Sequence, residues 1–397
     1  MRILKKGAKI LLVFFIIITI VTPTIIYGES SNVDKFSKSS ILIDEDTNRV
    51  LYEKNPDEKR PLASLSKMMT FLIAIEAIEN EEVKPSDIIV VDKDIAKVRG
   101  SSYHLKVGEK VPLIELMKGL MIVSGNDAAV GISKHISKSE EEFVKRMNKR
   151  AKEIGMKNTS FVNCNGLPIY SLADPKKPPK ENISTARDIA ILGKYMFDNY
   201  EKQVTDITDM QVYSYEERQF CKNNTNSALL SSIEEVDGIK TGYTGNAGYC
   251  LAFSMKINKD DKNEENRLIG VTLGANHKNK RLQAAMAMLK YGKNNFSTMK
   301  VMTKEELIGK KYIKGLDELE ITLESKGDLF IVKKNDENIN TQVTFKELSM
   351  PIKKGDVLGV IKYYNDDGEI LGVNEIISKK DLCDVSLKTR IKMLFVD

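Results

Sequence analysis

A hydroxyl and an amine lie three residues apart near the start of the chain, at Ser64 and Lys67. Apolar residues then recur with helical spacing as far as Ile75, so this segment is expected to begin a buried helix. Residues i and i+3 share one face of a helix, which would bring the Ser64 hydroxyl beside the Lys67 amine. A serine is a weak nucleophile until a base takes its proton, and a lysine kept neutral by burial or a nearby cation can be that base. The free N–H groups at a helix start would favour a developing oxyanion.

The segment Ser124-Gly125-Asn126 could add a second hydroxyl and a carboxamide to this pair. It follows a predicted helix over residues 113–122, so it is expected in a loop between helices. In that position Ser124 could pass a proton between the lysine amine and a leaving amine. Asn126 could hold a substrate amide and position Lys67.

A second lysine lies in Lys240-Thr241-Gly242, within a predicted strand over residues 236–241. A cation at Lys240 would lower the pKa of the first lysine, and Thr241 beside it could bind a carboxylate. Gly242 has no side chain, so a substrate backbone could approach the strand and add to it. The N–H of Tyr243 and the N–H of the nucleophilic serine could form an oxyanion hole. Together these groups suit acyl transfer from a peptide that ends in a free carboxylate.

The composition indicates a globular protein and carries no signature of nucleic-acid binding. Hydrophobic residues make up 42% of the 397 residues, ample for a large core, and 61 basic residues nearly balance 56 acidic ones. The histidines form no H-E-x-x-H or clustered zinc motif, so no metal or other cofactor is expected. The cysteines are too widely spaced for metal pairs, and free, mostly buried thiols are expected at Cys164, Cys221, Cys250 and Cys383.

Residues 1–28 have the pattern of a signal peptide and are not expected to belong to the fold. Arg2 and three lysines flank the start of the apolar stretch 10–21, and a cleavage site could follow Gly28. Export to the cell envelope or beyond is therefore expected. An uncleaved anchor remains an alternative, because the stretch 10–27 is barely long enough to span a membrane.

Residues 32–295 are expected to form one domain of helices and strands that positions these motifs. A hairpin opens it over residues 39–56, and helix patterns then dominate as far as the second lysine motif. The predicted helices begin at or near residues 64, 113, 139, 185 and 280, and the predicted strands cover residues 236–241, 248–256 and 268–273. Residues 168–180 contain several prolines and lysines and are expected to form a loop.

Short strand patterns separated by turn residues replace the helix patterns near residue 297. The predicted strands cover residues 319–323, 329–332, 342–345, 357–364 and 369–373. A small all-β domain over residues 299–380 is expected. It contains no nucleophile with a base, so we interpret it as a spacer or docking module. The chain then ends in a short basic amphipathic tail, residues 386–397, which could touch an anionic membrane peripherally. A helix docked on the β domain or a frayed tail would fit this stretch equally well.

The three motifs, in this order, resemble those of the low-molecular-mass penicillin-binding proteins, which are serine D-alanyl-D-alanine carboxypeptidases. The resemblance covers roughly residues 33–294. It includes the longer stretches Pro61-Leu62-Ala63-Ser64-Leu65-Ser66-Lys67, Ser184-Thr185-Ala186-Arg187-Asp188 and Asp237-Gly238-Ile239-Lys240-Thr241-Gly242-Tyr243. It implies an α/β (α+β) catalytic domain of the transpeptidase and β-lactamase type, with an antiparallel sheet and helices, followed by a β-rich domain.

The resemblance also implies an activity and its partners. Ser64 would be the active-site serine, and the enzyme would release the terminal D-alanine from peptidoglycan stem peptides that end in D-Ala-D-Ala. β-Lactam antibiotics would act as covalent inhibitors. Arg281 matches a family arginine that attracts the substrate carboxylate, although a solvated helix arginine is an equally good interpretation.

The chain departs from the family pattern at Asn165-Gly166-Leu167, where a histidine usually precedes the Gly-Leu pair. A class A β-lactamase is a weaker interpretation, because residues 158–168 contain no glutamate to activate a deacylating water. A peptidoglycan D,D-endopeptidase could use the same site on a longer leaving group. A non-catalytic wall-binding or β-lactam-sensing module is the remaining alternative, and the intact set of catalytic residues argues against it.

Overall fold

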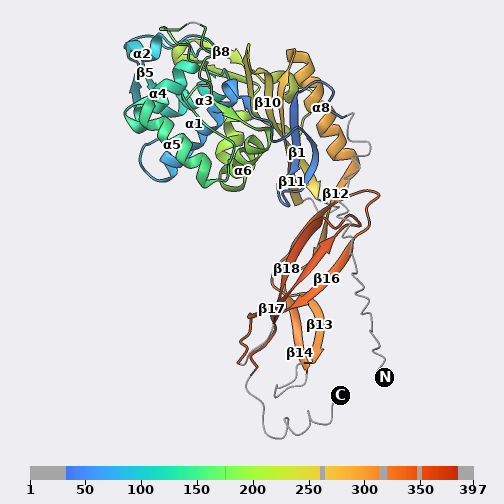
Figure 1. Cartoon of the computed structure of the whole chain (residues 1–397). Helices are drawn as coiled ribbons and strands as arrows, with labels where there is room; N and C mark the ends of the chain where they lie inside the picture. Colours follow the sequence, from blue (N-terminus) through green and yellow to red (C-terminus); the bar gives the residue numbers. More distant parts are fainter. Residues whose placement is uncertain (1–32, 175, 260–263, 313–319, 347–350, 383–397) are drawn as a thin grey trace, which may run out of the picture.

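The computed structural model of the chain describes residues 33–174, 176–259, 264–312, 320–346 and 351–382. Figure 1 shows a broad domain of helices and strands joined to an elongated domain of strands. The predicted signal segment and the predicted C-terminal tail lie outside the described residues. Within these ranges, no helix combines the length and the apolar character needed to cross a bilayer.

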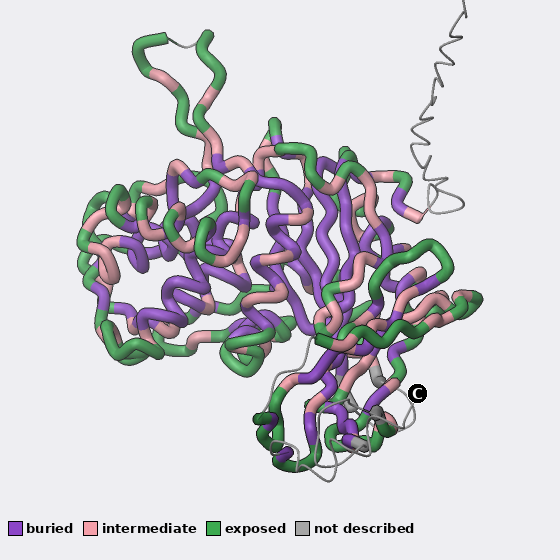
Figure 2. The backbone as a smooth tube through the Cα atoms, turned by 60° about the horizontal axis from the view of Figure 1, so that its bottom comes forward, coloured by how far each residue is buried: buried purple, intermediate pink, exposed green. Residues whose placement is uncertain are grey.

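A five-stranded antiparallel sheet forms the centre of the first domain, in the order β2-β1-β11-β10-β9. Its strands are β1 (Ser39–Asp44), β2 (Val50–Lys54), β9 (Val236–Thr244), β10 (Gly248–Lys259) and β11 (Glu264–Ala275). The predicted hairpin and the three predicted strands are confirmed, although each of the three is longer than predicted. Figure 2 shows the central strands as largely buried. Strand β9 ends the order and therefore has one edge free of a strand partner.

Helices cover both faces of this sheet. On one face, β10 and β11 pack against α8. Phe253 of β10 and Met288 of α8 belong to one buried apolar cluster. The opposite face carries α6 and, beyond it, a helical layer. The helices of the domain are α1 (Lys67–Glu79), α2 (Lys93–Ala96), α3 (Leu113–Met121), α4 (Asn126–Ser137), α5 (Glu140–Glu153), α6 (Ala186–Thr208), α7 (Ser227–Leu230) and α8 (Lys278–Asn295).

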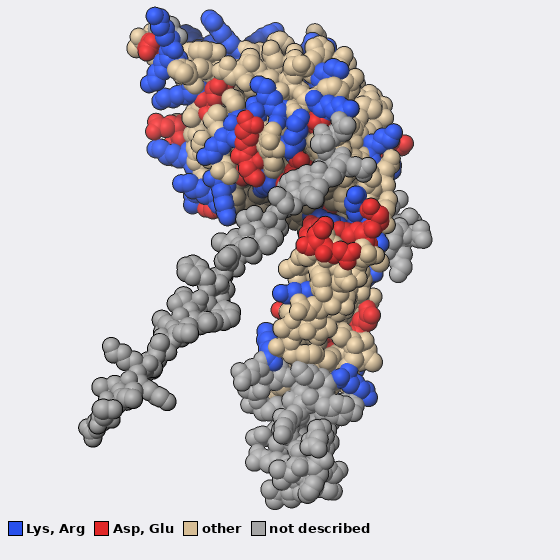
Figure 3. Space-filling model, turned by 45° about the vertical axis from the view of Figure 1, so that its right-hand side comes forward, with Lys and Arg blue, Asp and Glu red and all other residues tan. Residues whose placement is uncertain are grey.

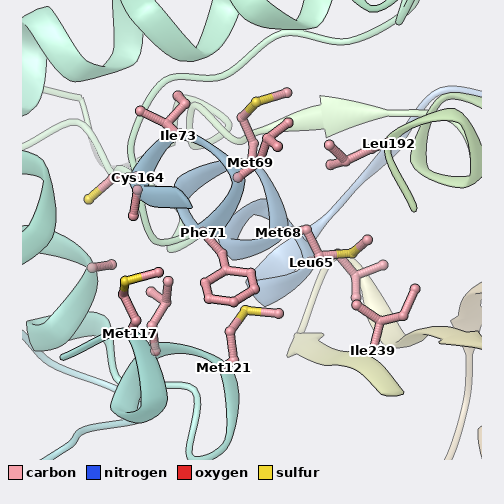
Figure 4. Close-up of a cluster of buried hydrophobic side chains, with 14 of the residues drawn as sticks. Leu65, Met68, Met69, Phe71, Ile73, Met117, Met121, Cys164, Leu192 and Ile239 are labelled. Carbon is pink, nitrogen blue, oxygen red and sulfur yellow. The ribbon is translucent and has the colours of Figure 1, made fainter. Parts of the chain in front are cut away.

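Helix α1 runs through the middle of the helical layer and is apolar on all sides. Its side chains from Met68 to Ala77 are buried, which is typical of a helix enclosed by others. Figure 4 shows Phe71 facing Met117 and Met121 of α3, with Cys164 nearby. This packing fixes the helix in place, and with it the lysine at its first position.

Side-chain caps start two of the neighbouring helices as the sequence predicts. The Ser139 hydroxyl accepts a hydrogen bond from Glu142 N at 3.2 Å and begins α5. The Thr185 hydroxyl accepts one from Asp188 N at 3.0 Å and begins α6. These caps satisfy N–H groups that have no partner within the helix.

Two details of the predicted helices are wrong. Ser64 lies in a 3-10 turn, η2 (Ala63–Ser66), and the α-helix begins only at Lys67. Asn126 is the first residue of α4 and does not lie in a loop. The short pairs of strands were not predicted, because two to four residues carry too little periodicity: β3 (Arg60–Pro61) with β6 (Ile183–Ser184), β4 (Ile88–Val90) with β5 (Lys110–Pro112), and β7 (Val212–Tyr215) with β8 (Phe220–Asn223).

The second domain consists of strands around its own apolar core. Its strands form one two-stranded and one five-stranded sheet, in the orders β12-β15 and β13-β14-β18-β17-β16. They are β12 (Phe296–Met302), β13 (Leu307–Tyr312), β14 (Glu320–Ser325), β15 (Leu329–Lys334), β16 (Asn340–Phe345), β17 (Val357–Tyr364) and β18 (Ile370–Ser378). The all-β class is confirmed, but β12 and β13 were not among the predicted strands.

Arg49 of the first domain forms hydrogen bonds with residues of the second domain. Arg49, beside the turn between β1 and β2, forms two hydrogen bonds with the Glu337 carboxylate at 2.6 and 2.7 Å. It also contacts Glu369 Oε2 at 2.8 Å and Val332 O at 2.7 Å. Figure 3 shows acidic side chains gathered where the second domain meets the first. Only 10% of the Arg49 side chain and 12% of the Glu337 side chain are exposed, so this is not an ordinary surface ion pair.

Candidate active site

The predicted pair of nucleophile and base is in contact. Lys67 Nζ lies 2.9 Å from Ser64 Oγ. In a 3-10 turn, the side chains of residues i and i+3 lie almost directly above one another. In an α-helix, the same two side chains are offset around the helix axis. The Lys67 side chain is fully buried, so bulk water does not compete for its amine.

Two carbonyl oxygens hold the same amine from other directions. Lys67 Nζ lies 2.6 Å from Asn126 Oδ1 and 2.6 Å from the backbone oxygen of Asn165. Both oxygens can only accept hydrogen bonds. A neutral amine has two N–H donors and one lone pair, so these two carbonyls use the donors and leave the lone pair for the hydroxyl of Ser64. With the amine neutral, this arrangement would suit a base that accepts the serine proton.

Burial is the main cause of a lowered pKa at Lys67. It brings the pKa from its ordinary value to about 7, while Cys164 and Asp127 act in the opposite direction. The sequence-based expectation allowed either burial or the charge of Lys240 as the cause, and the structure favours burial. In the structure the repulsion between the two amines is seen instead at Lys240, whose pKa is lowered by burial first and by Lys67 second.

The Ser124-Gly125-Asn126 segment turns sharply, and its Asn126 side chain contacts Lys67. Ser124 has a left-handed backbone with φ of 63° and is buried. Asn126 N donates to Ser101 O, and Asn126 Nδ2 donates to Arg99 O, both at 2.8 Å. The amide orientation is thereby fixed, with its nitrogen toward Arg99 and its oxygen toward the lysine.

A neighbouring carboxylate, which the sequence analysis did not single out, supports this segment. The buried Asp127 side chain accepts hydrogen bonds from Ser102 Oγ, Tyr103 N and Leu105 N at 2.7–3.1 Å. It therefore holds the loop whose carbonyls bind Asn126. Its place directly after the predicted motif was the only signal of this role in the sequence.

Lys240 reaches the site from the free edge of the sheet. It is buried on β9, and its Nζ donates to Thr241 O at 3.0 Å. Arg281 of α8 lies near enough to contribute to the lowered pKa of Lys240. Arg281 is half-buried and donates to Cys250 O at 3.3 Å, so it is not the solvated helix arginine of the alternative interpretation. A carboxylate bound here would interact favourably with both basic side chains and would favour their protonated forms, so this part of the site suits such a group.

Gly242 is needed because the strand passes close to the nucleophile. A Cβ atom at this position would lie 3.2 Å from Ser64 N and 3.1 Å from Leu62 O. The absence of a side chain lets β9 approach the 3-10 turn that contains Ser64. Tyr243 follows Gly242 on the strand, and 56% of its side chain is exposed.

The backbone oxygen of Asn165 is a functional group that the sequence analysis missed. It is presented by a turn in which Gly166 has φ of +87°, and a Cβ atom on Gly166 would lie 1.9 Å from Ala63 O. Only glycine fits that conformation and that approach. Because the contact to Lys67 is made by the backbone, residue type at position 165 gave no indication of it.

Comparison with known proteins gives two family matches. Residues 28–277 match the family described as D-alanyl-D-alanine carboxypeptidase. Residues 296–383 match the family described as penicillin-binding protein 5, C-terminal domain. The two matches cover the domain of helices and strands and the domain of strands, respectively.

Individual relatives extend over most of the chain. The D-alanyl-D-alanine carboxypeptidase DacF of Bacillus subtilis is 35% identical over 91% of this chain and 90% of its own. The structure of penicillin-binding protein 5 from Haemophilus influenzae covers 88% of this chain and 98% of its own, with a TM-score of 0.74 and 27% identity. Penicillin-binding protein D2 from Listeria monocytogenes, solved in its ampicillin-bound form, covers 65% of this chain and 98% of its own, with a TM-score of 0.56 and 26% identity.

Proposed function

The chain belongs to the D-alanyl-D-alanine carboxypeptidase family, and from this premise we propose that Ser64 is the residue on which its acyl-enzyme forms. The enzyme is a serine D-Ala-D-Ala carboxypeptidase of the low-molecular-mass penicillin-binding proteins. The observation that carries the assignment is the position of Lys67 Nζ, 2.9 Å from Ser64 Oγ with both other contacts made to carbonyl oxygens. The substrate is a peptidoglycan stem peptide that ends in D-Ala-D-Ala.

Acylation begins when Lys67 takes the Ser64 proton and the serine oxygen attacks the carbonyl carbon of the penultimate D-alanine. The N–H groups of Ser64 and Tyr243 stabilise the resulting oxyanion. The carbon–nitrogen bond then breaks, and the proton returns through Lys67 and Ser124 to the nitrogen of the departing D-alanine. An ester on Ser64 and free D-alanine are the products.

Deacylation uses the same groups on water. Lys67 takes a proton from a water molecule, the hydroxide oxygen attacks the ester, and the proton passes to the Ser64 oxygen as the ester bond breaks. The burial that keeps the Lys67 pKa near 7 makes the amine a usable base at neutral pH in both steps.

The terminal carboxylate of the substrate binds near the second lysine. Lys240 and Arg281 supply positive charge there, and the Thr241 hydroxyl donates a hydrogen bond. The substrate backbone lies along the free edge of β9, where Gly242 leaves room for it and Asn126 can hold its amide. A free carboxylate at the end of the peptide is thus the main determinant of recognition.

We place the enzyme in the cell envelope, where this substrate occurs, after export directed by residues 1–28. β-Lactam antibiotics are expected to acylate Ser64, because a strained amide beside a carboxylate imitates the D-Ala-D-Ala end. The ampicillin-bound structure of the Listeria monocytogenes relative supports this expectation. Any peripheral membrane contact would involve residues 386–397, which lie outside the described residues.

The reaction is tested by incubating the purified protein with a peptide that ends in D-Ala-D-Ala and measuring the products by mass. Loss of a single alanine is expected, and Ser64→Ala should remove it almost completely while leaving the thermal unfolding profile nearly unchanged. A Ser64→Ala variant that kept a tenth of the wild-type turnover would show that another group is the nucleophile. A cross-linked stem-peptide dimer is incubated in parallel, and its cleavage without alanine release from the first peptide would instead identify a D,D-endopeptidase.

A further inference from the structure

A projecting loop begins immediately after the turn that holds Lys67. Residues 168–174 and 176–180 form this projection, which we call the arm. Its base is closed by two hydrogen bonds, from Ile169 N to Lys180 O and from Lys180 N to Ile169 O, both at 2.9 Å. Figure 2 shows the arm extending from the catalytic domain with most of its residues exposed.

The base of the arm is tied to both sides of the catalytic site. On one side, Asn163 Nδ2 donates to Leu167 O at 2.6 Å, within the turn whose Asn165 oxygen holds the catalytic lysine. On the other side, Glu181 Oε2 accepts from Asn246 Nδ2 at 3.0 Å. Asn246 lies in the turn between β9 and β10, at the end of the strand along which the substrate would lie. The arm therefore rises from the rim of the site.

Apolar and basic side chains on the arm are exposed. Leu172 is 99% exposed and Tyr170 is 64% exposed. Lys176 and Lys177 are exposed and form no ion pair with any residue in the described ranges. An isolated leucine at full exposure gains nothing from the hydrophobic effect in the folded protein alone. Apolar and basic groups presented together, away from the core, form a surface suited to a partner that is partly apolar and negatively charged.

We propose that the arm binds the acidic glycopeptide polymer that carries the scissile stem peptide, beyond the part that enters the site. The proposal rests on the proposed function, because it takes peptidoglycan as the substrate. Lys176 and Lys177 would pair with free carboxylates on neighbouring stem peptides. Tyr170 and Leu172 would pack against the apolar faces of the sugars and peptide side chains. Each contact is weak alone, but it acts on a substrate already held in the site, so the effects combine.

Location favours this partner over an anionic membrane. The arm shares its base with the turn that holds the catalytic lysine and with the turn at the end of β9. A polymer whose stem peptide occupies the site must leave over the rim from which the arm projects. With about six residues in each limb, the arm can extend at most ~20 Å from that rim. This is the scale of a few sugar and peptide units.

Two arm variants and a matched control separate polymer binding from catalysis. The arm variants are Lys176→Gln/Lys177→Gln and Tyr170→Ser/Leu172→Ser. The control is Lys149→Gln/Lys152→Gln, which removes two exposed lysines of α5. For each protein, kcat/KM is measured on a soluble D-Ala-D-Ala peptide and on purified peptidoglycan. Binding to the same peptidoglycan is measured by sedimentation with Ser64→Ala added to each protein, so that this readout needs no turnover.

Both arm variants are expected to lose about tenfold in kcat/KM and in binding on peptidoglycan, and to stay within about twofold of wild type on the soluble peptide. The loss in the lysine variant should shrink as salt is raised, because exposed charges are screened. Equal loss on both substrates, or no loss of binding, would overturn the proposal. So would loss of binding to phosphatidylglycerol vesicles with peptidoglycan binding retained. An inactive wild-type protein would contradict the proposed function, while the sedimentation result would still decide the role of the arm.

Discussion

Lys67 Nζ faces Ser64 Oγ from 2.9 Å, on the side of the amine that its two carbonyl partners leave open. Which of the two atoms donates the hydrogen bond matters as much as the distance between them. Were the lysine charged, all three contacts could be donated by its ammonium group, and the serine would keep its proton. In the neutral form only two donors remain, and the serine hydroxyl must be the donor. The protonation state of one amine thus decides whether the site can begin its reaction.

Acylation should therefore depend on pH through Lys67. Its pKa is lowered to about 7 by burial, so the amine is neutral above that value and protonated below it. Since only the neutral amine can accept the serine proton, the acylation rate should fall about tenfold for each pH unit below ~7. Stopped-flow measurement of acylation between pH 5 and pH 9 would show this limb. A rate that stays flat down to pH 5 would contradict the assignment of Lys67 as the base.

Replacing Lys67 and replacing Lys240 should impair different steps of the reaction. Lys67→Ala should slow acylation by a hundredfold or more, the usual contribution of a general base. Lys240→Ala should weaken the binding of substrate and β-lactam as well, because a charged hydrogen bond of about 1.5–3 kcal/mol to the carboxylate is lost. Pre-steady-state kinetics over a range of substrate concentrations would separate the rate from the affinity. A Lys67→Ala variant that acylates at the normal rate would refute the base role.

Benzylpenicillin should leave a long-lived adduct on Ser64. Its carboxylate would bind at Thr241 and Arg281 as the substrate carboxylate does. The nitrogen released by ring opening stays tethered to the acyl group, so it continues to obstruct the approach of water. The sequence offers no glutamate at the position where class A β-lactamases activate water, so hydrolysis depends on Lys67 and Ser124.

Intact-mass measurement after mixing, followed by peptide mapping, would detect the adduct and locate it. Ser64→Ala provides the control, since it should remain unmodified. Rapid release of penicilloic acid with no trapped protein would instead favour a β-lactamase.

Arg49→Ala should destabilise the junction of the two domains and leave catalysis intact. It removes the partner of Glu337 and Glu369, and the Glu337 carboxylate is mostly enclosed. The Glu337 carboxylate would keep hydrogen bonds from Asn365 Nδ2 and Lys334 N but lose its charged partner. The expected cost is about 2–3 kcal/mol, less than for a fully buried pair. Calorimetry should show a lower unfolding temperature or a separated transition for the second domain. Arg146→Ala, which breaks an exposed pair with Glu82, is the control and should change little.

The sequence predicted the chemistry of the site better than its geometry. Ser64, Lys67, Lys240 and Thr241 stand out because three motifs occur together and in one order, whereas a serine and a lysine three residues apart are common on their own. The 3-10 turn at Ser64 could not be predicted in this way, because four residues are too few to distinguish a period of 3.0 residues from one of 3.6.

Backbone contacts and long-range carboxylates account for most of what was missed at the site. The Asp127 side chain binds a loop more than twenty positions away in the sequence, and no local pattern encodes such a pairing. Strands β12 and β13 were missed for a related reason. Each has a mixed polar sequence, and each is a strand because a distant partner, β15 or β14, lies beside it.

The hydrogen bond from Lys67 Nζ to the Asn165 carbonyl has a consequence for which substitutions the site can accept. Every amino acid carries the same carbonyl, so exchanging the residue at position 165 does not delete the contact. Asparagine can therefore stand where relatives usually have histidine while the chemistry is kept. A survey of single substitutions should find Gly166 intolerant, while any loss at position 165 would come from its side chain, whose Oδ1 accepts a hydrogen bond from Leu167 N at 2.9 Å. Substitutions at position 165 therefore cannot reveal the hydrogen bond that its carbonyl accepts from Lys67. Substitutions of Gly166 can, because they disturb the turn that presents this carbonyl.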